Sequence, residues 1–168
     1  MSRQLIDISK TVDLITMLLP VGGKNLLLPN VTVAEIIQLG ELVETADMPN
    51  WFKGSCSWRG TRIPIVAFGA INRDEFLDRE SGFHAAVING SFDATNLPFY
   101  AIVTESTPRM MRISSKEIVE NADIAAGPAE LMTVDACGEA ATIPNLDFIE
   151  ELLVGIVSQL DQKMSQAS

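Results

Sequence analysis

Short apolar runs, broken about every ten residues by glycine, proline or polar residues, set the pattern of this chain. Runs of this length that are rich in β-branched residues are typical of strands. The pattern predicts strands at residues 13–21, 25–29, 32–39, 55–59, 62–68, 83–89, 97–105, 110–113, 131–134 and 140–143. Many short strands with few helical stretches between them favour small barrels over alternating strand–helix units.

The stretch 47–69 carries the densest set of turn signals. Residues 48–52 predict a short helical turn, which Gly54 ends by adopting a positive φ. Gly60-Thr61 predicts the two-residue loop of a β-hairpin. Pro64 cannot donate a ladder hydrogen bond, so we expect its nitrogen to face a sheet edge or a bulge.

One amphipathic helix closes the chain. Asn145 is its predicted N-cap, and acidic residues follow in the first turn, where they favour the positive end of the helix dipole. An apolar stripe at i, i+3, i+4 spacing contains Ile149, Leu152, Leu153, Ile156, Val157 and Leu160. We expect this stripe to pack on the protein's own barrels, and binding of a partner protein is the alternative.

These elements predict a mainly β protein of two five-stranded barrels of SH3-like size, with the helix closing them. At 168 residues the chain is long enough for two small barrels that share one core. The predicted bounds are an N-terminal tail at 1–12, a single domain at 13–162 with barrels at 13–80 and 83–145 and a helix at 146–162, and a C-terminal tail at 163–168.

The charge is acidic and unevenly distributed. Twelve Lys and Arg stand against 22 Asp and Glu, and the whole excess lies in residues 117–162, which hold ten acidic residues and no Lys or Arg. Such a surface repels phosphate, which argues against a nucleic acid as partner. Solubility accounts for most of these carboxylates, and attraction to a basic protein surface is the alternative.

Signatures of catalysis, metal binding and cofactor binding are missing. His84 is the single histidine, and Cys56 and Cys137 lie far apart without C-x-x-C spacing, which favours two reduced thiols. The sequence has no nucleophile elbow and no phosphate loop. We therefore predict a binding protein with no catalytic residues, no metal and no cofactor. A hydrolase using Cys56 or Ser55 with His84 is a remote alternative.

The chain shows no sign of membrane insertion. No apolar run approaches the roughly 18–20 residues that a transmembrane helix needs. Asp7 interrupts the apolar part of the N-terminus, and no signal-peptide cleavage site follows. We expect a cytoplasmic protein.

Three motifs follow one another between Val33 and Phe68: V-A-E-I, M-P-N-W-F-K-G and W-R-G-T-R-I-P-I-V. Their order and spacing resemble the CheW-like chemotaxis coupling domain, which has V-x-E-I, a Pro-led turn, an N-L-R-G hairpin and a P-I-V-D-L strand. Residues 101–118 resemble a second, less specific segment of the family. With the closing helix, the resemblance covers roughly residues 13–160.

The resemblance implies two barrels side by side with a hydrophobic seam between them. It also implies a non-catalytic adaptor that couples methyl-accepting chemoreceptors to a CheA-type histidine kinase at receptor clusters on the membrane. The receptor hairpin would bind in the groove between the barrels, and the kinase's CheW-like domain would dock end to end. Trp58 replaces the motif's leucine and Ser57 its asparagine. These departures raise the hypothesis of a divergent member from a type IV pilus or surface-motility system.

Six residues are the expected partner-binding positions: Val33, Glu35, Ile36, Trp58, Arg59 and Arg62. Arg59 stands at the arginine of N-L-R-G, which implies a role in coupling receptor to kinase, and an internal ion pair with Glu35 is the alternative. Val33 and Ile36 belong to V-x-E-I, and their odd separation predicts that they face opposite sides of a strand. Trp58 and Arg62 join the set because two arginines flank a rigid turn beside an indole.

The alternative function is that of a small-barrel peptide- or protein-binding module in another pathway. Such a module could hold a proline-rich peptide between Trp51, Trp58 and Tyr100 if folding brings these dispersed aromatic residues together.

Overall fold

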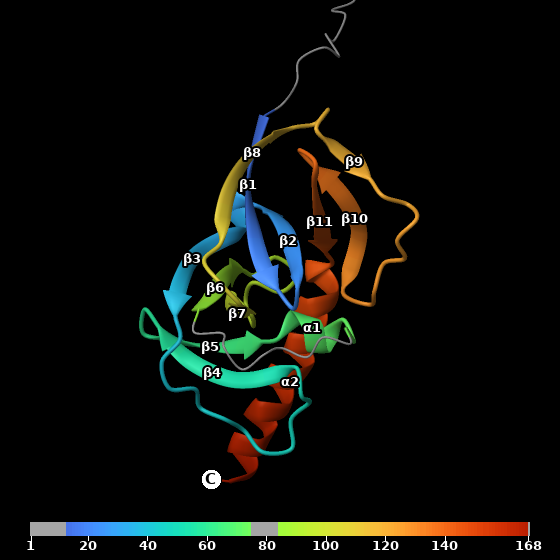
Figure 1. The fold of residues 1–168 in the computed structure, drawn as a ribbon. Helices are drawn as coiled ribbons and strands as arrows, with labels where there is room; N and C mark the ends of the chain where they lie inside the picture. The colour runs from blue at the N-terminus through green and yellow to red at the C-terminus, as the bar shows by residue number, and fades with distance from the viewer. Residues whose placement is uncertain (1–12, 75–83, 168) are drawn as a thin grey trace, which may run out of the picture.

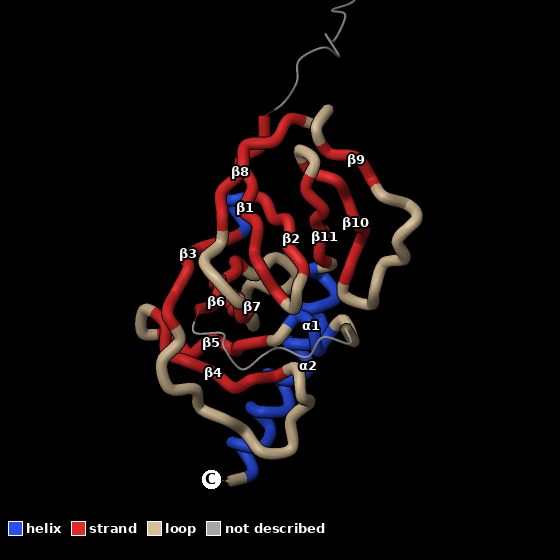
Figure 2. Tube along the Cα trace, in the orientation of Figure 1, coloured by secondary structure: helices blue, strands red, loops and turns tan. Residues whose placement is uncertain are grey.

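The computed structural model describes residues 13–74 and 84–167, and it is mainly β with one long helix at the end (Figures 1 and 2). The mainly β fold class and the closing helix are confirmed. The predicted N-terminal tail lies outside the described residues. The elements are β1 (Asp13–Val21), β2 (Lys24–Pro29), η1 (Asn30–Thr32), β3 (Val33–Gln38), β4 (Phe52–Trp58), β5 (Thr61–Val66), α1 (Phe68–Ile71), β6 (His84–Asn89), β7 (Phe99–Thr104), β8 (Arg109–Ser114), β9 (Ile118–Glu120), β10 (Glu130–Ala136), β11 (Glu139–Pro144) and α2 (Leu146–Gln166).

The strands form two sheets. The six-stranded sheet has the order β8-β1-β2-β11-β10-β9, and the five-stranded sheet has the order β3-β6-β7-β5-β4. Most neighbours are antiparallel, but β11 pairs with β2 and β5 pairs with β7 in parallel. Neither hydrogen-bonded ladder closes on itself, so the two predicted barrels are two open sheets, one of them with a sixth strand.

The two sheets do not follow the predicted barrel bounds of 13–80 and 83–145. The five-stranded sheet uses the consecutive strands β3 to β7, so β6 and β7 pair with strands of the first half. The six-stranded sheet joins both ends of the chain through the parallel contact of Thr142 with Leu26. A pairing between residues so far apart leaves no local signal, because strand spacing reports only neighbours along the chain.

Three apolar clusters form the core. One lies within the six-stranded sheet and contains Leu18, Leu27, Ile113, Val134, Ala136 and Ala141. A second lies within the five-stranded sheet and contains Cys56, Trp58, Ile63, Ile65, Ala85, Val87 and Ala101. The central cluster takes residues from both sheets and both helices, among them Leu19, Leu26, Phe68, Ile88, Ile102, Ile149 and Leu153. It corresponds to the hydrophobic seam that the resemblance implies.

The closing helix α2 belongs to the central cluster. The Asn145 side chain accepts a hydrogen bond from the backbone N–H of Phe148 at 3.2 Å, which confirms the predicted N-cap. Ile149 and Leu153 are fully buried, so the apolar stripe packs on the protein's own sheets as expected. The helix continues to Gln166, four residues beyond its predicted end. No helix among the described residues is long and apolar enough to cross a membrane.

A buried carboxylate ties α2 to the five-stranded sheet. Glu150 is fully buried and accepts hydrogen bonds from Tyr100 Oη at 3.1 Å and from the backbone N–H groups of Ser91 and Phe92. Burial, together with the Glu150 charge, raises the pKa of Tyr100, so its hydroxyl remains a donor. A buried charge is tolerated when it is hydrogen-bonded in this way.

A second polar cluster joins β2, the end of α1 and the start of β10. Glu130 Oε1 accepts hydrogen bonds from Lys24 Nζ at 2.5 Å and from Asn72 Nδ2 at 2.8 Å, and Oε2 accepts one from the N–H of Gly127. Burial acts to raise the pKa of Glu130, but the hydrogen bonds from Gly127 and Lys24 outweigh it and hold the pKa below its ordinary value. The cluster therefore fixes α1, which follows the five-stranded sheet's β5, against the six-stranded sheet.

The packing of α2 predicts the effect of a charge in its buried face. Leu153→Asp should lower the free energy of unfolding by at least about 4 kcal/mol, because it places an unpaired carboxylate in the central cluster. Ser158→Asp, at an exposed position of the same helix, should change it by less than about 1 kcal/mol. Urea unfolding followed by circular dichroism measures both. A stably folded Leu153→Asp protein would contradict the packing described.

The Glu130 cluster predicts a pH-dependent contribution to stability. The pKa of Glu130 is lower in the folded protein than its ordinary value of 4.5, so its stabilisation is present above that pH and is lost as the pH falls through the folded value. Glu130→Gln should therefore unfold at lower urea concentration than the wild type at pH 7, and the difference should shrink at pH 3. Glu120→Gln, at an exposed site, is the control at pH 7. A difference that does not depend on pH would argue against a charge-based contribution.

Candidate functional site

The hairpin that carries Arg59 has a different register from the one predicted. Trp58 pairs with Thr61, so the two-residue loop is Arg59-Gly60 and not Gly60-Thr61. Both loop residues have positive φ, 47° and 78°, as a type I′ turn requires. This turn matches the twist of the flanking strands, so it is preferred even though it places an arginine in the left-handed region. Arg59 therefore projects from the tip of the hairpin.

The segment before this hairpin forms no helix, so the helical turn predicted at 48–52 is replaced by a single turn followed by the start of β4. Phe52 begins β4, and a turn closed by its N–H and the carbonyl of Pro49 precedes it. Gly54 does have the expected positive φ, but it uses it at a bulge within β4, where a Cβ would lie 2.5 Å from the carbonyl oxygen of Val43. Glycine is therefore required here because the backbone of Val43 lies so close, and not because the residue ends a helix.

Pro64 lies in β5, an interior strand. It pairs with Ser55 of β4 but has no partner on β7, because the parallel pairing begins at Ile65. Its nitrogen therefore interrupts no bond between β5 and β7. This is how proline is accommodated away from a sheet edge.

Glu35 of β3 contacts two residues at the hairpin tip. Its Oε2 accepts a hydrogen bond from Trp58 Nε1 at 2.8 Å and lies 3.1 Å from Arg59 Nη2. The Arg59 guanidinium lies over the Trp58 ring, 4.9 Å from its centroid. The internal ion pair considered from the sequence is thus present, and we call these three residues the Glu35 cluster.

The Glu35 cluster has one buried member and two exposed ones. Trp58 is 9% exposed and packs edge-on against Phe99 inside the five-stranded sheet, whereas the side chains of Arg59 and Glu35 are 69% and 41% exposed. A surface ion pair of this kind contributes only about 0–1 kcal/mol to stability. Since a guanidinium has five N–H donors, Arg59 can bind a second carboxylate while it keeps its contact with Glu35.

Val33 and Ile36 face the same side, contrary to the expectation from their odd separation. Both are half-buried and pack against the central cluster. The reason is a β-bulge between Val33 and Glu35, which adds a residue to β3 relative to β6 and changes the alternation. Ile37 packs instead in the cluster within the five-stranded sheet. The strand therefore directs Glu35 to the hairpin and Val33 and Ile36 to the seam.

Exposed apolar residues border the seam where the sequence analysis did not place any. Ile15 of β1, Val31 of η1 and Met110 of β8 are 42%, 82% and 64% exposed, and we call them the seam rim. Met110 pairs with Met17, which packs against the central cluster, and Ile15 is two residues from Met17 on the same face of β1. Ile15, Met17 and Leu19 are apolar residues at every second position of β1, and this spacing could have predicted an apolar face on that strand.

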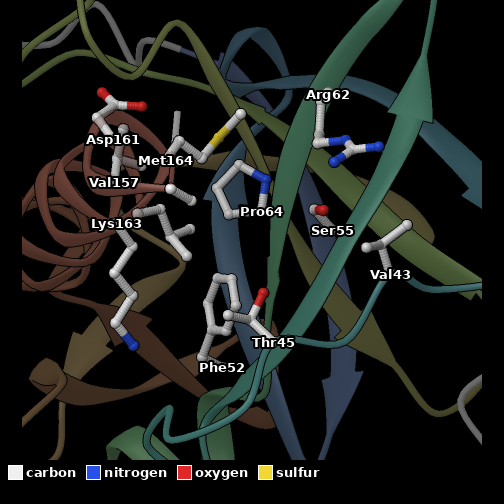
Figure 3. Close-up of a pocket in the computed structure, with 12 residues that line it drawn as sticks. Val43, Thr45, Phe52, Ser55, Arg62, Pro64, Val157, Asp161, Lys163 and Met164 are labelled. Carbon is white, nitrogen blue, oxygen red and sulfur yellow. The ribbon is translucent and has the colours of Figure 1, made fainter.

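Arg62 lies apart from the Glu35 cluster. It pairs with Ser57 on the hairpin, and its side chain lines a groove of about 480 Å³ between the hairpin and the C-terminal half of α2 (Figure 3). The six sequence-predicted residues thus lie at three places: Glu35, Trp58 and Arg59 in one cluster, Val33 and Ile36 at the seam, and Arg62 in the groove.

The residues of the alternative functions do not come together. Tyr100 is buried in the central cluster and Trp51 packs at its edge, whereas Trp58 belongs to the cluster within the five-stranded sheet. These three aromatic residues therefore do not form one peptide groove. Burial raises the pKa of the Cys56 thiol, which disfavours the thiolate that a nucleophile needs.

Comparison with known proteins adds two findings. The sequence pattern of the family described as "CheW-like domain" matches residues 16–149. Among solved structures, scaffolding protein TtCheW from Thermoanaerobacter tengcongensis superposes with a TM-score of 0.65 at 12% identity, over 82% of this chain and 87% of that chain. No curated protein sequence matches the chain.

The Glu35 cluster predicts a spectroscopic effect. The chain has two tryptophans, so each indole N–H gives its own resonance. Glu35→Ala should shift the Trp58 indole N–H resonance and speed its exchange with water, because it removes the acceptor of that hydrogen bond. Glu35→Gln retains an acceptor oxygen and should shift it less. The Trp51 resonance is the internal reference, and an unmoved Trp58 resonance in Glu35→Ala would contradict the contact.

Proposed function

The chain belongs to the CheW-like domain family, and from this premise we propose that it is a non-catalytic signalling adaptor. It couples methyl-accepting chemoreceptors to a CheA-type histidine kinase in a two-component pathway for chemotaxis or pilus-based motility. It works in the cytoplasm at receptor clusters. The observation that carries the proposal is the meeting of two family-matched residues, Glu35 and Arg59, at an exposed hairpin tip.

Arg59 supplies the contact to the kinase. Its guanidinium is held by Glu35 and by the Trp58 ring, so binding a partner carboxylate costs little further side-chain entropy. An arginine fork binds a carboxylate through two parallel hydrogen bonds, which fixes orientation as well as affinity. Trp58, where the family motif has leucine, shapes the surface beside it, and this change fits a specialised pathway such as that of type IV pili.

The seam supplies the contact to the receptor. Above the half-buried Val33 and Ile36, the seam rim leaves Ile15, Val31 and Met110 open to solvent. Exposed apolar patches mark interaction sites, and the apolar face of a helix fits such a surface. A helical hairpin of the receptor packs there. Because β3 carries both Glu35 and Ile36, one strand adjoins both contacts.

Arg59→Ala tests the adaptor role. The purified chain, immobilised in cell extract, should retain a multidomain histidine kinase and a methyl-accepting receptor, and the substitution should reduce recovery of the kinase, whose contact Arg59 supplies, at least about tenfold. The melting temperature should fall by no more than about 2–4 °C, because the lost ion pair is exposed.

Arg109→Ala is the matched control for this experiment. It removes an exposed arginine from an ion pair with Glu139 on the other sheet, so it should leave recovery of both partners unchanged. Recovery of neither partner by the wild type would refute the adaptor role. A large loss of stability in Arg59→Ala would instead assign Arg59 to holding the hairpin.

A further inference from the structure

The loop between β6 and β7, residues 90–98, is closed by its own hydrogen bonds. The N–H of Gly90 donates to the carbonyl of Pro98 at 2.8 Å. A Cβ at Gly90 would lie 1.9 Å from a backbone carbonyl oxygen of the same loop, so only glycine fits this close approach. Between these ends, Asp93 accepts hydrogen bonds from the backbone and the side chain of Asn96. These contacts fix the shape of the loop before any partner binds.

A buried carboxylate anchors this loop to α2. Glu150 Oε2 accepts hydrogen bonds from the N–H of Ser91 at 3.1 Å, from Ser91 Oγ at 3.3 Å and from the N–H of Phe92 at 2.6 Å. Glu150 is fully buried, and no ion pair among residues 13–74 and 84–167 includes it. Burying a charge without an ion-pair partner costs free energy, so stability alone would favour a neutral side chain here. The position that the carboxylate gives to Ser91 and Phe92 accounts for its presence.

Phe92 is open to solvent although its backbone is anchored. The residue is 52% exposed, and its N–H makes the shortest of the hydrogen bonds to Glu150. Leu97 of the same loop is only 2% exposed, so the loop buries one large apolar residue and exposes the other. An exposed aromatic ring on a fixed backbone is typical of a contact residue, because little conformational entropy remains to be lost on binding.

The anchored loop adjoins the seam rim. Asn89, the last residue of β6, donates a hydrogen bond from Nδ2 to the carbonyl of Val31 at 3.1 Å, and Val31 is the most exposed residue of the seam rim. Three residues span at most about 11 Å, so the Cα of Phe92 lies within that distance of the Cα of Asn89. Each helix is about 10–12 Å across, which makes a helical hairpin roughly 20 Å wide. A hairpin that packs on Val31 is therefore wide enough to reach Phe92 as well.

We propose that Phe92 is a contact residue for the helical hairpin of the receptor and that Glu150 is the residue that positions it. This inference rests on the proposed adaptor role. It extends the receptor contact to a loop outside the family-like motifs at 33–68 and 101–118. An apolar side chain of the receptor packs on the Phe92 ring while the seam rim takes the neighbouring part of the hairpin. Through Glu150, α2 acts on receptor binding without touching the receptor.

Phe92→Ala tests the contact. The probe is the purified cytoplasmic domain of the methyl-accepting receptor that the wild-type chain retains from cell extract, and isothermal titration calorimetry with the full chain measures its dissociation constant. The substitution should raise this constant at least about tenfold. Recovery of the kinase should not change, because Arg59 lies in the separate Glu35 cluster. The melting temperature should change by no more than about 2 °C, because Phe92 is half exposed.

Leu131→Ala is the matched control for this experiment. Leu131 lies on β10 and is 55% exposed, so its truncation removes a similar amount of exposed apolar surface far along the chain from the loop. It should leave the dissociation constant of the receptor domain unchanged.

Glu150→Gln tests the positioning role. It keeps the size of the side chain but replaces one acceptor oxygen by an NH2 group, so fewer hydrogen bonds hold the loop. The N–H of Phe92 should exchange faster with solvent, and the dissociation constant of the receptor domain should rise at least about threefold. Combined with Phe92→Ala, Glu150→Gln should weaken receptor binding no further, because it acts through Phe92. A merely structural role would weaken binding equally with and without the Phe92 ring.

Two results would overturn this inference and leave the adaptor role intact. One is a receptor domain that binds Phe92→Ala as tightly as the wild type. The other is an effect of Glu150→Gln that remains undiminished when Phe92 is already alanine. A wild type that retains no receptor from cell extract would instead refute the adaptor role and, with it, this inference.

Discussion

Burial of the central apolar cluster is the interaction on which the rest of this structure depends. Both sheets contribute one face to it, and α2 adds Ile149 and Leu153. Each sheet also has a smaller cluster of its own, but these hold fewer residues, and the larger share of the core lies between the sheets. Apolar burial is the main favourable term in folding, so neither sheet is expected to be stable without the other and the helix. The buried contacts of Glu130 and Glu150 then fix their relative position.

The position of the candidate site follows from one irregularity in that arrangement. A bulge in β3 turns Val33 and Ile36 toward the central cluster while Glu35 reaches the hairpin tip. A regular strand would alternate its side chains and bring only one of the two apolar residues to the seam. Bulges redirect side chains in this way without changing the sheet as a whole. The seam and the hairpin tip thus become neighbouring surfaces on one rigid strand.

The sequence predicted what depends on neighbouring residues. The strands predicted at 13–21 and 25–29, which pair as β1 and β2, and the Asn145 cap follow from strand, turn and capping residues within a few positions of each other. The Glu35–Arg59 contact was considered because the resemblance placed both residues in one site. The bulge in β3, the one-residue shift of the Arg59-Gly60 turn and the division of strands between the sheets were not predicted. They depend on which strands become partners, and that information is distributed over the whole chain.

The parallel pairing of β2 with β11 also affects the order in which the strands can pair during synthesis. Strands β3 to β7 complete one sheet by residue 104, but β1 and β2 lack their neighbours until residues 109–144 have been synthesised. On the ribosome, β1 and β2 are therefore made before β3 to β7 but are fully paired only after them. Contacts of such long sequence separation are slow to form, because a long loop must close first. Until then the apolar residues of β1 and β2 lack these neighbours, so we expect this interval to be the one in which the nascent chain is most open to aggregation or chaperone binding.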